Sequence, residues 1–240
     1  MTRWLSVVAV LLSVRPAAAS QGEPAGQGTP PAAQESTLPV HDVGVSFGLG
    51  VDYTRSSAGT DSTNGLLRLN VAWSPLDWLE VSFFTPGLSV LLGSRHGDEV
   101  VLSAGLDGLG YSSVEGVIYI PSVGAAYRHW FSGATSLGVS ARWSSRYSQS
   151  PPMPRLTGSV FLTHTIGDVV SLNFAIGGTG WSDLFGLTFG SVRPGVRSLP
   201  LVQVHLSAVW SIDLDARLTL WLHPEVQTAL QAVLGFSAIW

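Results

Sequence analysis

The last eleven residues of the chain alternate between two kinds of side chain. Apolar residues occupy every second position from Leu230 to Trp240, while the positions between them, from Gln231 to Ile239, are smaller and more mixed. A period of two is typical of a β-strand whose two faces meet different surroundings. The C-terminal segment is therefore predicted to be a strand that continues to the final residue.

The same alternation recurs along most of the chain after residue 39. One face carries Val, Leu, Ile, Phe or Trp, and the other is dominated by Gly, Ser, Ala and Asn; the clearest segments are 43–53, 67–73, 137–144, 170–177 and 202–212. Weaker segments are 79–84, 117–129, 156–166 and 218–222, and a short turn is predicted at 213–216. With the C-terminal strand, the predicted total is ten strands, and eight or twelve are the alternatives.

Hydropathy decides how such strands are arranged. The mean hydropathy is +0.32 and only 12% of the residues are charged, yet no apolar run beyond the N-terminal segment is long enough to cross a bilayer as a helix. A bilayer admits only helices and closed barrels, because every backbone polar group needs an internal partner. A secreted β-sandwich also alternates, but its solvent face would carry more charge. We predict an all-β, antiparallel up-and-down transmembrane β-barrel over residues 40–240.

A strand that ends on an aromatic residue, after alternating apolar positions, resembles the C-terminal strand of bacterial outer-membrane β-barrel proteins. In that family these positions form the recognition signal for insertion. The resemblance implies this role for Phe236 and Trp240. It also implies outer-membrane lipid and the barrel-assembly machinery as partners.

We expect Trp240→Ser to impair assembly, because it removes the terminal aromatic residue of that signal. The measurement is the yield of protein in the outer-membrane fraction that migrates faster on a gel before boiling than after it. Normal insertion and yield in this variant would contradict the assigned role.

The N-terminal segment has the pattern of a secretory signal. Met1-Thr2-Arg3 is followed by an apolar run over 4–14 and by Ala17-Ala18-Ala19, so residues 1–19 are predicted to be a cleaved signal peptide. The absence of cysteine excludes a lipid anchor. Residues 20–39, rich in Gly, Pro, Gln and Ala, are predicted to be a disordered periplasmic leader. The expected location is the bacterial outer membrane.

Composition excludes several kinds of function. The chain has no cysteine, which rules out disulfides, thiolate metal sites and a cysteine nucleophile. Its formal net charge is −4 and all twelve basic residues are arginines, so nucleic acid is not expected as a partner. The scattered histidines lack the paired spacing of a zinc site. We expect no cofactor and no metal.

The register of the alternation turns several polar residues toward the inside of the barrel. In a narrow barrel such residues usually fill the interior with ion pairs and hydrogen bonds. The alternative is a narrow polar conduit in which arginines favour anions. The lumen-lining candidates are Arg68, Glu80, Arg142, His205, Asn173 and Gln203.

Two long segments, 93–113 and 178–197, are predicted to be outer loops. The first carries His96, Asp98 and Glu99, and the second carries Asp183. A histidine beside acids can act as a general base, as in the omptin surface proteases, but the spacing does not match theirs. A solvated charged loop is the preferred interpretation of 93–113. The partly apolar loop 178–197 either extends its flanking strands above the membrane, folds over the barrel mouth, or binds a partner or a hydrophobic ligand.

The sequence therefore favours a non-enzymatic barrel with a structural, adhesive or small-solute role. A narrow, anion-leaning channel or transporter is the alternative. A surface hydrolase at the rim, built from the loop candidates, is the least favoured interpretation. The sequence does not determine the solute or the oligomeric state.

Overall fold

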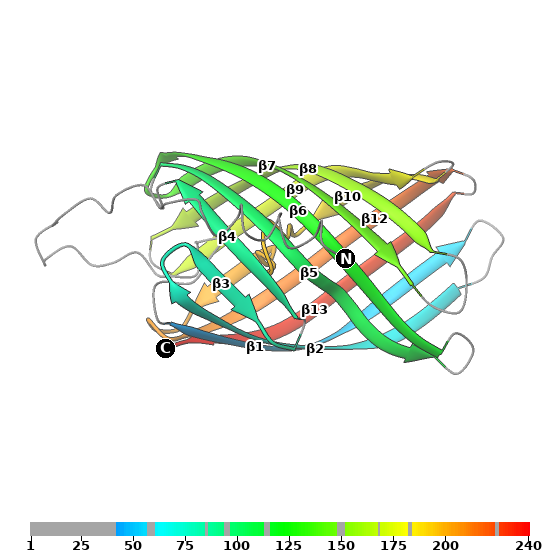
Figure 1. The fold of residues 1–240 in the computed structure, drawn as a ribbon, viewed down its shortest axis with the longest axis horizontal. Helices are drawn as coiled ribbons and strands as arrows, with labels where there is room; N and C mark the ends of the chain where they lie inside the picture. The colour runs from blue at the N-terminus through cyan, green and yellow to red at the C-terminus, as the bar shows by residue number, and fades with distance from the viewer. Residues whose placement is uncertain are drawn as a thin grey trace, which may run out of the picture.

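The computed structural model describes residues 42–56, 61–84, 86–93, 97–112, 116–147, 152–167, 169–181, 184–223 and 226–240. These residues form one antiparallel sheet that closes on itself, because the first strand pairs with the last (Figure 1). The described part of the chain has no helix long and apolar enough to cross a membrane. The signal peptide and leader predicted for residues 1–39 lie outside the described residues.

The strands run alternately up and down around the barrel. They are β1 (Val43–Ser56), β2 (Asp61–Leu76), β3 (Leu79–Ser82), β4 (Gly87–Gly93), β5 (Asp98–Ser112), β6 (Gly116–Ser132), β7 (Thr135–Arg146), β8 (Met153–Ile166), β9 (Val170–Trp181), β10 (Leu184–Gly190), β11 (Val202–His205), β12 (Trp210–His223) and β13 (Gln227–Ile239). We call the end that holds Trp240 the near end and the opposite end the far end.

The alternation seen in the sequence becomes an apolar outer face. Where the barrel closes, Phe47 of β1 stands opposite Phe236 of β13, and Leu49 stands opposite Leu234. All four side chains are exposed, with Leu234 at 60%. Exposed apolar residues that alternate with interior ones are what a barrel surrounded by lipid requires.

The barrel wall has twelve strand positions rather than ten. Among the described residues there are thirteen strands, but β10 and β11 share one position between β9 and β12. The predicted count of ten was wrong, and the alternative of twelve describes the wall. The two missing positions are those of β4 and β5, because residues 87–92 were assigned to no strand and residues 93–113 were predicted to be a loop.

Two predicted connections and one predicted strand are corrected by the structure. Most of the predicted loop 93–113 is strand β5, and the predicted turn 213–216 lies within β12. The predicted strand 202–212 is interrupted at 206–209. Charged residues caused the first two errors: Asp107 and Asp215 resemble turn residues in the sequence, but in the barrel they pair with arginines across the lumen.

Aromatic residues gather near both ends of the wall. At the near end the rings of Trp210 and Trp240 meet edge to face with their centroids 5.7 Å apart. Toward the far end the rings of Tyr119 and Tyr147 stack at 5.2 Å. Amphipathic rings at these levels are typical of the two interfaces of a membrane.

The chain leaves the wall after β10. Gly190 has a φ of +120°, and a Cβ atom there would lie 2.1 Å from the carbonyl oxygen of Ala216. Only glycine tolerates this backbone so close to a neighbouring strand. Residues 191–201, which we call the inward segment, then run inside the barrel before β11 rejoins the wall (Figure 1).

The inward segment corrects the prediction for 178–197. That stretch was expected to be an outer loop, but it contains the end of β9, all of β10 and the first half of the inward segment. Val192 and Leu199 pair as an isolated bridge, with the amide of Leu199 donating to the carbonyl of Val192 at 2.8 Å. The segment is thus a small hairpin folded into the lumen, and both residues of the bridge are buried.

Candidate functional site in the lumen

The inward segment reaches across to the opposite wall. The amide of Val196 donates to Ser89 Oγ of β4 at 2.8 Å. Arg142 of β7 donates from Nη2 to the carbonyl of Gly195 at 2.7 Å. At its other end, Asn173 of β9 donates to the carbonyl of Pro200 at 2.8 Å. These contacts fix the segment in the middle of the barrel.

The two arginines of the inward segment carry positive charge into the lumen. Arg193 Nη1 lies 3.2 Å from Asp107 Oδ1 of β5. Arg197 Nη1 lies 3.6 Å from Glu80 Oε2 of β3, and the Glu80 side chain is fully buried. The segment is therefore held electrostatically as well as by its backbone.

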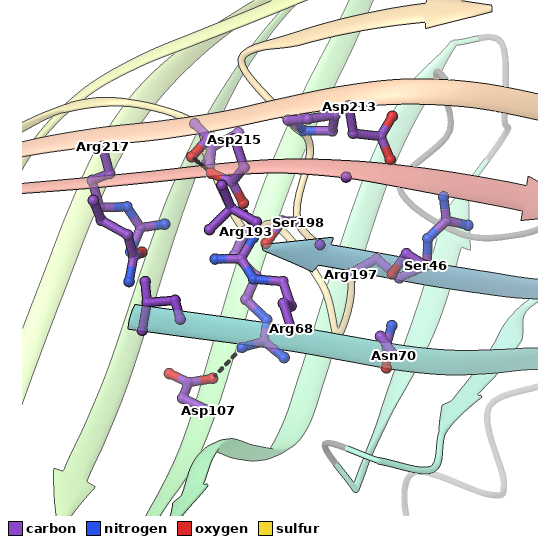
Figure 2. Close-up of a pocket in the computed structure, with 18 of the residues that line it drawn as sticks. Ser46, Arg68, Asn70, Asp107, Arg193, Arg197, Ser198, Asp213, Asp215 and Arg217 are labelled. Atoms are coloured by element: carbon purple, nitrogen blue, oxygen red, sulfur yellow. Dashed lines mark hydrogen bonds and ion pairs between the residues drawn. The ribbon is translucent and has the colours of Figure 1, made fainter. Parts of the chain in front are cut away.

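Further charged residues from the wall surround it. Arg142 Nη1 lies 2.8 Å from Asp107 Oδ1, which also accepts a hydrogen bond from Ser122. Arg68 of β2 and Ser191 both donate to Asp215 of β12. Figure 2 shows Arg68, Arg193 and Asp215 converging on this region from three separate parts of the chain.

Arg217 is one of three interior arginines with a buried nitrogen that has no hydrogen-bond partner among the described residues, together with Arg142 and Arg197. Arg217 projects from β12 on the same face as Asp215, toward the pocket (Figure 2). Its Nε is buried and has no hydrogen-bond partner among the described residues. A buried cationic group without a fixed partner is a favourable place for a solute anion to bind.

The space left around the inward segment includes a cavity with a mixed polar and apolar lining. Its volume is about 940 Å³. Its charged lining comprises six arginines and four aspartates, namely Arg68, Arg142, Arg155, Arg193, Arg197, Arg217, Asp52, Asp107, Asp213 and Asp215. Since arginines outnumber aspartates, the lining favours negatively charged solutes.

The six residues predicted to line the lumen divide into two groups. Arg68, Glu80 and Arg142 belong to the charged network around the inward segment. The other three side chains form hydrogen bonds toward the near end. Asn173 accepts from Thr163, and Gln203 donates to Ser237 at 3.3 Å. His205 contacts Ser171 and Ser211 at 3.0 Å each.

The sequence analysis missed much of this site. It did not identify Asp107, Arg193, Arg197, Asp213, Asp215 and Arg217. Asp213, Asp215 and Arg217 of β12 are spaced by two residues, which continues the alternation of a strand. This spacing could have predicted that all three face the lumen. No comparable signal identified Arg193 and Arg197, since an inward hairpin has the composition of an exposed loop.

Of the four loop candidates, the structure describes Asp98 and Glu99. Asp98 and Glu99 begin β5 at the near end, where Asp98 Oδ1 lies 2.6 Å from His129 Nδ1 on the outer face. Glu99 points inward and is buried against Arg128. His96 and Asp183 lie outside the described residues. Within the described residues no three acidic, histidine or cysteine side chains are arranged to hold a metal ion.

The closed antiparallel wall, its apolar outer face and its charged interior define a protein of the outer-membrane β-barrel class. A comparison of structures gives the same class. The COG4313 outer membrane channel from Pseudomonas putida F1 is similar over 92% of this chain and 100% of its own, with a TM-score of 0.55 and 11% sequence identity. Identity this low supports the fold alone.

Other outer-membrane barrels are more distant. The CymD monoaromatic hydrocarbon channel matches 85% of this chain and 90% of its own with a TM-score of 0.47 and 7% identity. The KdgM porin matches 82% of this chain and 98% of its own with a TM-score of 0.40 and 8% identity. No protein-family model and no curated protein sequence matches the chain.

Proposed function

We propose that this protein is a narrow outer-membrane channel for small solutes that favours anions. The near end, where the C-terminus lies, would face the periplasm, and the far end would face outward. The inward segment would set the width of the path. No catalytic role is proposed.

The observation that carries the proposal is the cavity beside the inward segment. A barrel built only for structure would fill its interior with packed side chains, as small barrels do. Here a cavity of about 940 Å³ remains, and arginines outnumber aspartates among its lining residues. Similarity to a solved barrel described as a channel is consistent with the proposal but does not establish it.

Arg217 provides the sharpest test of anion preference. We expect Arg217→Gln to shift the reversal potential of single channels in a potassium chloride gradient toward cations, because it removes a lining charge that lacks a fixed partner. The measurement is made on purified protein in planar bilayers. Arg55→Gln is the matched control, since Arg55 is exposed at the far end of β1 and does not line the cavity.

Three outcomes would contradict the proposal. Absence of any conductance from folded, heat-modifiable wild-type barrels would favour a structural or adhesive role. Channels that conduct but whose anion preference is unchanged by Arg217→Gln would mean that the solute path avoids this face of β12. Equal shifts in Arg217→Gln and Arg55→Gln would assign the effect to overall charge rather than to the lumen.

A further inference from the structure

The barrel wall is incomplete on one side. The hairpin of β3 and β4 reaches only partway up, since Ser82 pairs with Ala72 of β2 and Gly87 pairs with Gly105 of β5. Figure 1 shows both strands within the half of the barrel that holds the C-terminus. In the described residues, 61–70 of β2 pair only with β1, and 107–112 of β5 pair only with β6.

Two strand positions are therefore missing between β2 and β5 above the hairpin. Neighbouring strands lie about 4.8 Å apart, so two missing positions leave up to roughly 14 Å between the two backbones. That width would admit an alkyl chain. We call this interruption of the wall the side opening.

The cavity lining shows that the side opening communicates with the lumen. On β7, β8 and β12 only alternate residues line the cavity, whereas on β1, which is paired on both sides and lies beside β2, the five consecutive residues 44–48 line it. On β2, five consecutive residues from Leu66 to Asn70 line it, and they include Leu67 and Leu69 of the outer face. Phe84, at the tip of the β3–β4 hairpin, also lines it. The cavity thus passes around the free edge of β2 to the outer surface.

The chemistry of the side opening changes from outside to inside. Its outer parts are apolar and exposed, with Leu67 at 70% and Phe84 at 57%. Leu66 and Ile120 continue the apolar lining inward, and Arg68 follows on β2. Unpaired backbone groups of a strand edge are costly in hydrocarbon and are tolerated where they border a polar cavity. The edges of β2 and β5 meet that condition only if the opening stays joined to the lumen.

We propose that the side opening is a lateral portal between the lumen and the surrounding bilayer, and that it passes small anionic amphiphiles with an apolar tail and a carboxylate head. This inference rests on the proposed channel function and names the solute class. The tail would leave through the apolar rim formed by Leu66, Leu67, Leu69, Phe84 and Ile120. The carboxylate would stay among the arginines of the lumen until the tail is in lipid.

The first experiment tests the opening independently of transport. The chain contains no cysteine, so Leu66→Cys and Thr157→Cys each provide one labelling position. Both residues line the cavity, but Thr157 lies on β8, which is paired on both sides. With a small fluorophore attached, phospholipids that carry a nitroxide on the acyl chain should quench the label at position 66 and leave position 157 bright.

The second experiment tests the solute class. A dodecanoate bearing a nitroxide on its tail should quench the label at position 157, and its methyl ester should not. Leu66→Trp combined with Ile120→Trp should abolish this quenching by filling the apolar rim, while chloride conductance remains. Val139→Trp, on the outer face of the paired strand β7, is the control for an added tryptophan.

The results separate the two proposals. Equal lipid quenching at positions 66 and 157, or none at either, would overturn the portal whatever the conductance. If the nitroxide dodecanoate fails to quench the label at position 157 in protein that lacks the two rim tryptophans, the proposed solute class is overturned. Absence of chloride conductance in wild type would overturn the channel function even if the side opening admits lipid.

Discussion

Single-channel conductance should rise several-fold when residues 193–198 are replaced by Asn-Gly. Val192 and Leu199 are directly paired, so a two-residue turn can close the hairpin between them without disturbing the wall. The replacement removes both arginines of the inward segment and the part that contacts β4 and β7. The measurement is the conductance of purified barrels in planar bilayers.

The control for this prediction keeps the segment and weakens only its anchoring. Ser89→Ala removes the hydroxyl that accepts from the amide of Val196 and should leave the mean conductance nearly unchanged while adding brief transitions to higher levels. An unchanged conductance in the Asn-Gly replacement would show that the limiting constriction lies elsewhere. The inward segment would then be a structural brace rather than the element that sets the width.

Glu99→Ala should destabilise the barrel by about 3–5 kcal/mol, because it leaves a buried guanidinium without its carboxylate. Glu99 and Arg128 stand opposite each other on β5 and β6. Arg128 donates to Glu99 Oε2 from Nε at 2.9 Å and from Nη2 at 2.6 Å. Trp130 Nε1 donates to the other carboxylate oxygen at 3.2 Å. Urea-induced unfolding in detergent micelles measures the loss.

The neighbouring residue supplies a matched control. Asp98 also forms a cross-strand ion pair, with His129, but both side chains face outward and are about half exposed. Exposed pairs contribute about 0–1 kcal/mol, so Asp98→Ala should shift the unfolding midpoint little. Glu99→Leu combined with Arg128→Met should recover much of the stability, because no unpaired charge remains. Similar losses for Glu99→Ala and Asp98→Ala would contradict the explanation by burial.

The strands that could be predicted are those with two contrasting faces. In β1, β7, β9 and β13 every second residue meets the outer surface, so the sequence records the surroundings of each residue directly. Where the interior is itself apolar the contrast fails, as in β6, whose Ile118 and Ile120 alternate with exposed Val117 and Tyr119. Such strands were predicted only weakly, and the strand count was wrong because β4 and β5 were not predicted as strands.

Interior charges were the second source of error. The predicted lumen residues Arg68 and Arg142 lie in strands with clear alternation, and their direction followed from the period of two. Asp213 and Asp215 follow the same period in β12, yet two acids so close together were interpreted as a turn. The arginine partner of Asp215 is Arg68 of β2, and such pairing is invisible until the strands are placed side by side.

The sequence by itself determined the class of fold, since apolar alternation without a spanning helix leaves a closed barrel as the arrangement that satisfies every backbone group in a bilayer. It also determined which face of each well-patterned strand meets the outside. Only the tertiary structure decided the number of wall positions, the inward course of residues 191–201 and the short β3–β4 hairpin. Those features depend on which strands become neighbours and on charges that meet across the lumen, and such long-range contacts leave no local period in the sequence.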